Sequence, residues 1–165
     1  MNPKVMDAVG FISRFVNDHW ERMADSSEVR DELSNQGFST KEISDAFKWI
    51  EANTLGTDYA SAPLEAPGKA PMRTLTDAER EKLSAGAVGL LMQFYSKGIV
   101  DALILEEILE RVAKSEQDEL DEKEIKRITA LTLFTRIQDE WLEILHSTNT
   151  SVSYTHLRAH ETLRY

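Results

Sequence analysis

The chain has 165 residues, of which 41% are hydrophobic and 29% are charged, and its net charge at pH 7 is −10. A chain of this length and apolar content can bury a core, which argues against a wholly disordered protein. It contains no cysteine, which excludes disulfide frameworks, thiolate catalysis and iron–sulfur clusters and suits a reducing compartment. We therefore expect a cytoplasmic protein.

No segment has the pattern of a signal peptide or of a membrane span. Charged residues interrupt the first apolar stretch, and the longest uninterrupted apolar run covers only residues 87–92. A helix that crosses a bilayer needs roughly 20 apolar residues. The acidic net charge also disfavours nucleic acid as a partner, because affinity for phosphate backbones comes largely from Lys and Arg.

Helical periodicity begins close to the first residue. Apolar side chains recur every three or four positions between Val5 and Met23, which predicts a helix over about residues 3–23 with one buried face. Pro3 suits the first turn of such a helix, because the missing N–H would have no partner there.

Two shorter helices are expected next, joined by a tight turn. Ser26 or Ser27 can cap the second helix, and Gly37 in a left-handed conformation would end it. Ser39 and Glu42 have the spacing of a capping box, which starts a third helix. The buried face of this third helix is expected to hold four apolar residues: Ile43, Ala46, Phe47 and Ile50.

Residues 54–73 have no apolar period and contain three of the four proline residues. We interpret them as a linker between an N-terminal three-helix unit, residues 1–53, and a C-terminal helical unit, residues 74–150. A flexible linker of about 20 residues allows two such units either to dock or to stay apart. The sequence leaves both arrangements open.

The C-terminal unit starts with a second capping box, formed by Thr76 and Glu79. A single apolar stripe follows, so we predict one helix over about residues 77–97, which Gly98 ends.

Two glycines inside this predicted helix, Gly86 and Gly89, would let another helix approach closely. A further helix is expected to start at Asp101, and another at Asp121, which forms a capping pair with Glu124.

A last helix carries Trp141, and no Gly or Pro separates it from the helix before it. No run of β-branched residues alternates with polar ones, as a strand would require. The predicted fold class is therefore all-α: two small helical bundles, of about three helices and then three to four, joined by a Pro/Gly/Ala-rich linker.

Residues 151–165 break with the acidic helical pattern before them and show no period of 3.6 residues. From Val152 to Thr162 they resemble one reading frame of a transposon-end sequencing adapter. We therefore expect a non-native tail here, and a different natural sequence after Thr150. His156 and His160, which have the spacing of a metal-binding pair on a helix, are set aside with it.

Short motifs follow one another in a fixed order from about Met6 to Phe134. Among them are Gly37-Phe38, Ala46-Phe47-Lys48-Trp49-Ile50, Gly89-Leu90-Leu91 and Glu107-Ile108-Leu109-Glu110-Arg111. In this order they resemble the Smg family, small bacterial proteins of unknown function. The resemblance implies an all-helical cytosolic protein and supplies no catalytic residues. The chain departs from the family pattern after Phe134, where Thr135-Arg136-Ile137-Gln138 replaces an Asn-Pro-Gly break.

No set of residues forms a recognisable catalytic, cofactor or metal site. Glu143 and His146 have Glu-x-x-His spacing, but a di-iron bundle needs a second such pair and further glutamates. The sequence also lacks a phosphate-binding loop and the Gly-x-Ser-x-Gly motif of hydrolases. We therefore predict a non-enzymatic protein without a cofactor or metal.

Three aromatic residues make up the candidate interaction surface: Trp49, Tyr95 and Trp141. Trp49 and Tyr95 each lie about one position off the apolar stripe of their helix, so each either closes the edge of the core or anchors a partner. The leading interpretation is a protein–protein interaction or adaptor module with an unknown protein partner, which includes a second copy of the chain.

The alternative is a nucleic-acid-associated regulator with an element like a helix-turn-helix after Gly37. Its basic residues are scattered among acidic ones, so no basic helix face is visible. The scattered residues are Lys41, Lys48, Lys123, Lys126, Arg127 and Arg136.

Overall fold

The computed structural model describes residues 2–56 and 72–148, with side chains up to Gln138. Most of the expected linker and all of the expected tail lie outside the described residues. The helices are α1 (Pro3–His19), the 3-10 turn η1 (Trp20–Arg22), α2 (Ser27–Asn35), α3 (Thr40–Thr54), α4 (Asp77–Lys82), α5 (Ala85–Ser96), α6 (Ala102–Lys114) and α7 (Glu122–Thr148). The predicted all-α class is confirmed for this part of the chain.

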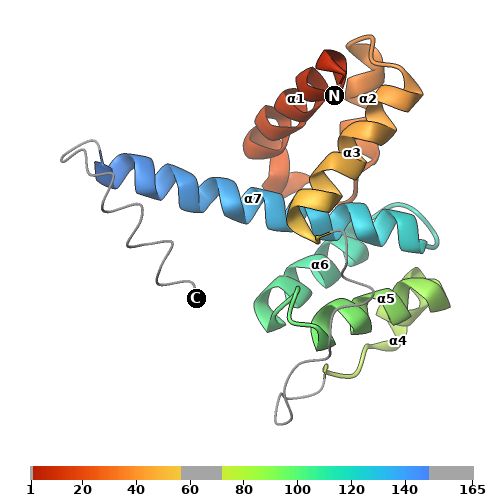
Figure 1. Ribbon diagram of the computed structural model, residues 1–165. Helices are drawn as coiled ribbons and strands as arrows, with labels where there is room; N and C mark the ends of the chain where they lie inside the picture. The colour runs from red at the N-terminus through yellow and green to blue at the C-terminus, as the bar shows by residue number, and fades with distance from the viewer. Residues whose placement is uncertain (1, 57–71, 149–165) are drawn as a thin grey trace.

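Helix α7 lies at the centre of the arrangement (Figure 1). It contacts α1 and α3 on one side and α5 and α6 on the other, and its C-terminal part extends past the other helices. Buried apolar residues from both sides belong to one hydrophobic cluster. The helices before and after the expected linker therefore dock, and α7 contacts helices from both sides. None of the described helices combines the length and apolar character needed to traverse a bilayer.

The turn between α2 and α3 has the predicted left-handed glycine. Gly37 has φ 94°, its N–H donates to Ser34 O at 3.1 Å, and the N–H of Phe38 donates to Leu33 O at 3.1 Å. These two bonds satisfy the last carbonyl groups of α2 in a Schellman motif. The capping box of Ser39 then starts α3 as predicted.

Replacing Gly37 with Ala is expected to lower the free energy of unfolding by about 1–2 kcal/mol, because a side chain at positive φ is strained. Gly10→Ala is the matched control. Gly10 lies within α1, where an added Cβ would meet only Arg14 Nη1 at 3.9 Å, so alanine should stabilise the helix by up to about 1 kcal/mol. Urea unfolding of both variants checks the sign of each change, and equal effects would contradict the account.

The single helix predicted over residues 77–97 is wrong, because the structure breaks it into α4 and α5. Leu83 is extended, with φ −117° and ψ 134°, and forms an isolated bridge with Leu120. The N–H of Ser84 donates to Leu120 O at 3.0 Å. The Ser84 hydroxyl then caps α5 by accepting from the N–H of Ala87 at 3.0 Å. A pairing with a distant segment thus overrides the local helical pattern.

The last two predicted helices form one continuous helix, α7, of 27 residues. The close approach expected at the glycines of α5 is confirmed at one position only. A Cβ at Gly86 would overlap the side chain of Glu122 at the start of α7, whereas a Cβ at Gly89 would meet no atom within 4 Å.

The start of α2 is held by α7 rather than by its own serine hydroxyl. Ser26 occupies the N-cap position but makes no side-chain cap; its N–H and hydroxyl donate to the Glu124 carboxylate at 2.9 and 2.8 Å. Asp25 accepts from the N–H of Ser27 instead, at 3.0 Å. Of the two hydrogen bonds in the predicted capping pair of Asp121 and Glu124, only one therefore forms. Asp121 accepts from the Glu124 N–H at 2.9 Å, while the Glu124 side chain reaches α2.

A polar network built around Arg111 joins η1, α6 and α7. The Arg111 guanidinium lies 3.5 Å from the centre of the Trp20 ring and donates to Trp20 O, at 2.6 Å, and to Met23 O. The Glu107 carboxylate accepts from Trp20 Nε1 at 2.9 Å, from Arg111 at 3.2 Å and from Arg136 at 3.1 Å. Burial would raise the pKa of Glu107, but these hydrogen bonds outweigh burial and hold it below its usual value.

The buried carboxylate of Asp25 joins the start of α2 to the segment after α6. It accepts from the Ser115 hydroxyl at 2.6 Å and from Gln117 Nε2 at 3.2 Å, in addition to Ser27. Burial raises the pKa of Asp25, but the hydrogen bonds from Ser115 and Ser27 outweigh burial, so the pKa lies below its usual value.

Because the pKa of Asp25 is lower in the folded state, its contribution to stability is present at neutral pH and is lost as the pH falls below about 4. Asp25→Asn is expected to lower the free energy of unfolding by about 2 kcal/mol at pH 7, since the neutral amide offers one acceptor oxygen in place of two charged ones. The variant should also lose less stability than the wild type between pH 5 and 3. Parallel slopes over this range would contradict the prediction.

Candidate interaction surface

The structure separates the aromatic residues proposed from the sequence. Trp49 on α3 and Tyr95 on α5 are both half-buried and pack against the hydrophobic core. Helices α3 and α5 lie on opposite sides of α7 (Figure 1), so these two side chains do not share one patch. Trp141 lies in α7 at a position whose side chain is outside the described residues.

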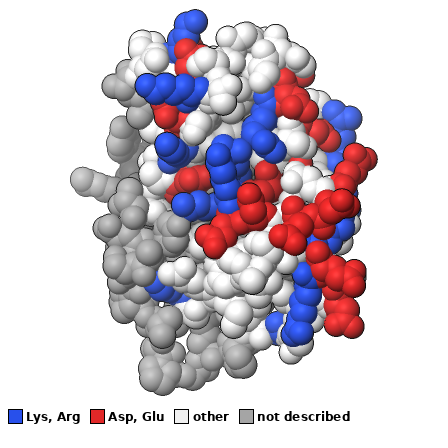
Figure 2. Space-filling view, turned by 90° about the vertical axis from the view of Figure 1, so that its right-hand side faces the viewer, with Lys and Arg blue, Asp and Glu red and all other residues white. Residues whose placement is uncertain are grey.

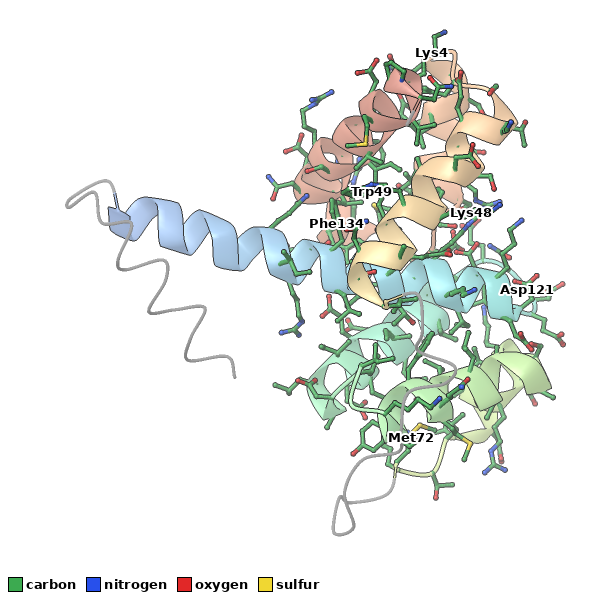
Figure 3. All side chains as sticks on the ribbon, in the orientation of Figure 1. Lys4, Lys48, Trp49, Met72, Asp121 and Phe134 are labelled. Atoms are coloured by element: carbon green, nitrogen blue, oxygen red, sulfur yellow. The ribbon has the colours of Figure 1, made fainter. Side chains whose placement is uncertain are left out.

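A groove of about 670 Å³ lies at the end of the molecule formed by α4 and α5. Figure 3 shows Met72 at this end, remote from Trp49. The extended segment before α4 forms one wall, and the outward face of α5 forms the other. The apolar residues that line the groove are Met72, Leu75, Leu83, Ala85, Val88 and Met92.

The floor and the walls of this groove differ in exposure. Leu75 and Leu83 are 6% and 4% exposed and belong to the core, so the floor is continuous with the packed interior. Met92 is 51% exposed, and Met72 and Val88 are half-buried. Methionine is flexible and polarizable, and proteins use it on surfaces that adapt to apolar partners. The groove can therefore accept an apolar side chain from outside the chain.

The two arginines on the rim have different surroundings. Arg73 donates to both carboxylate oxygens of Glu79, at 2.8 and 3.1 Å, and to the carboxylate of Glu106. These bonds raise the pKa of Arg73 and lower that of Glu79. Arg80 is exposed and forms no ion pair within the described residues. Arg73 thus fixes the wall before α4, and Arg80 remains available to a negatively charged group.

Sequence reasoning missed this groove because its residues come from segments with different predicted roles. Met72 and Arg73 fell within the expected linker, and Met92 fell outside the apolar stripe of a helix predicted to be unbroken. The one local signal is Met72 placed just before the capping box of Thr76. Among the side chains that the structure describes, which end at Gln138, no three acidic or histidine side chains are grouped so that they could hold a metal ion.

Comparison with known proteins gives a family match over most of the chain. The model of the family described as a protein of unknown function, DUF494, matches residues 12–159. The chain is 29% identical to a Smg homologue of Thioalkalivibrio sulfidiphilus, over 87% of this chain and 92% of that protein. It is 28% identical to a Smg homologue of Methylococcus capsulatus, over 85% of this chain and 88% of that protein. No solved structure matches the chain.

Proposed function

Since the chain belongs to the DUF494 family, whose function is unknown, we propose that it is a non-enzymatic, cytoplasmic interaction protein. It binds an amphipathic helix of a partner protein in the groove between the segment before α4 and helix α5. The observation that carries this proposal is the apolar groove itself, which opens to solvent beside a half-exposed methionine, Met92. Helix-in-groove binding uses such a surface, with apolar side chains one turn apart as anchors.

The charge on the rim indicates the kind of helix that would fit. Arg73 is neutralised by its own carboxylates, whereas Arg80 has no ion-pair partner among the described residues. A partner helix with an acidic residue beside its apolar face would complement Arg80 and cover Met92. Such rim charges contribute mainly to specificity and to the rate of association.

The alternative, a nucleic-acid-associated regulator, has weaker support. The helix after Gly37 would be the reading helix, and on it Lys41 and Lys48 are exposed beside half-buried Glu42 and Asp45. Acidic side chains of this kind oppose a phosphate backbone. We therefore keep the protein partner as the proposed function.

A photo-cross-linking residue placed at position 92 in living cells tests this proposal. Met92 and Met6 are similarly exposed, at 51% and 41%, and Met6 lies on α1, so position 6 is the matched control. A discrete cross-linked protein is expected from position 92 and not from position 6, and Val88→Glu should abolish it. Identical products from both positions would overturn the proposal.

Two further outcomes distinguish other occupants and surfaces. Cross-linking of the chain only to itself would place a second copy in the groove and contradict a separate partner. Loss of the product in Trp49→Ala, with retention in Val88→Glu, would assign the anchor to Trp49 and reject the groove.

A further inference from the structure

A second pocket, of about 320 Å³, lies between α3 and the first turns of α7, and it shares no residue with the groove. Figure 2 views the molecule from the side on which α7 begins and shows Lys and Arg gathered near the centre of this face, bordered by Asp and Glu. In Figure 3, Lys48 and Asp121 lie toward this same side. Four cationic residues line the pocket: Lys48, Lys123, Lys126 and Arg127.

Arg127 is the buried member of this set. Only 7% of the residue is exposed, and its guanidinium lies 4.7 Å from the centre of the Phe47 ring. Its Nε is buried and has no hydrogen-bond partner, and within the described residues no carboxylate forms an ion pair with Arg127. Burial, together with the charge of Arg30, lowers the pKa of Arg127, although the charges of Glu124, Glu51 and Asp121 act in the opposite direction. A buried guanidinium that no carboxylate contacts directly is costly, so the pocket favours an anion from outside the chain.

The balance of charge in the pocket points the same way. Its four cations face two acidic residues, Glu51 and Glu122, in a chain whose net charge is −10. Burial raises the pKa of Glu51 even though the charges of Lys126 and Arg127 lower it. The side chain of Glu122 lies against Gly86 of α5, at the edge of the pocket. Cations thus outnumber carboxylates among the residues that line this pocket of an acidic protein.

We propose that this pocket binds a small phosphate monoester. A phosphate monoester carries a charge near −2 at neutral pH, and the cations that line the pocket attract such a group. The planar guanidinium of Arg127 can donate two parallel hydrogen bonds to phosphate oxygens, and the lysines add point charges.

The remaining wall suits the organic part of such an ester. Ser44 supplies a hydroxyl, while Phe47 and Leu90 supply apolar surface. The volume is at the lower end of the range for small-molecule sites, which favours a small ester over a large nucleotide.

Isothermal titration calorimetry of the full chain tests the proposal by measuring its affinity for inorganic phosphate and for phenyl phosphate at constant ionic strength. Saturable binding of both probes is expected, with phenyl phosphate the tighter. Arg127→Gln should weaken both by at least tenfold. Lys48→Gln, at an exposed position where folding is not at risk, should weaken both by about threefold. Lys4→Gln, at an exposed position on α1, should leave both affinities unchanged.

Several results would overturn the proposal. These are the absence of saturable binding to the wild type, equal affinity in Lys48→Gln and Lys4→Gln, or displacement of both probes by an equal concentration of chloride. Binding of a phosphorylated peptide with no binding of phenyl phosphate would also reject the small-molecule assignment. A circular dichroism melt of each variant separates loss of the site from loss of the fold.

Discussion

Arg111→Met is expected to lower the free energy of unfolding by about 4 kcal/mol. The substitution removes the donors to the Trp20 and Met23 carbonyl groups and leaves the Glu107 carboxylate without one of its partners. Each buried carbonyl group left without its donor costs about 1–3 kcal/mol, whereas Glu107 keeps its hydrogen bonds from Trp20 and Arg136. Urea unfolding monitored by tryptophan fluorescence measures the change, and Trp20 should report it directly.

Lys114→Met is the matched control for this prediction. Lys114 forms an ion pair with Glu110 one turn away on the same helix, at 3.0 Å, but both side chains are more than half exposed. An exposed pair of this kind contributes about 0.5 kcal/mol or less. If the two substitutions cost the same, the network around Arg111 does not hold η1 against α6 in the way proposed.

Phe94→Ala is the second large effect, with an expected loss of about 4 kcal/mol. Phe94 is fully buried and belongs to the hydrophobic cluster that continues into α6 and α7. Deleting a buried phenyl ring removes its transfer free energy and leaves a cavity. Because this cluster also includes α1 and α3, the variant should unfold in one transition at lower urea concentration.

The neighbouring Met92→Ala provides the comparison. Met92 is half exposed, so its replacement should change the free energy of unfolding by no more than about 0.5 kcal/mol. A separate early transition in Phe94→Ala, with α1 to α3 unaffected, would show that the two sides of α7 unfold independently. That result would contradict one shared core.

The parts of the fold that the sequence predicted are those fixed by neighbouring residues. The capping boxes at Ser39 and Thr76 and the cap at Asp101 each depend on groups three positions apart. The turns at Gly37 and Gly98 require a positive φ, which glycine adopts without strain. Such features need no knowledge of the rest of the chain.

The features that the sequence did not predict depend on distant partners. The break between α4 and α5 arises because Leu83 pairs with Leu120, and the carboxylate of Glu124 turns away from its own helix start to Ser26. The continuity of α7 is an exception. Two helices were predicted, although no Gly or Pro interrupts this segment and the Asn-Pro-Gly break of the Smg family is absent.

The sequence also did not predict the pocket between α3 and α7 or the groove beside α5. The basic residues near the pocket looked scattered because Lys48 is far in sequence from Lys123 and Arg127, yet α3 and α7 pack together and bring them to one pocket. The groove was hidden because Met72 lay in a segment without periodicity. Trp49 and Tyr95, which the helical pattern did mark, stay predictions as partner anchors.

Amide hydrogen exchange of the full chain, with and without the partner helix identified by cross-linking, tests the central claim most directly. The groove hypothesis predicts slower exchange on binding in residues 72–92, which carry both walls of the groove, and no change in α1 and α2. Protection confined to α3 around Trp49, or no protection anywhere, would contradict it.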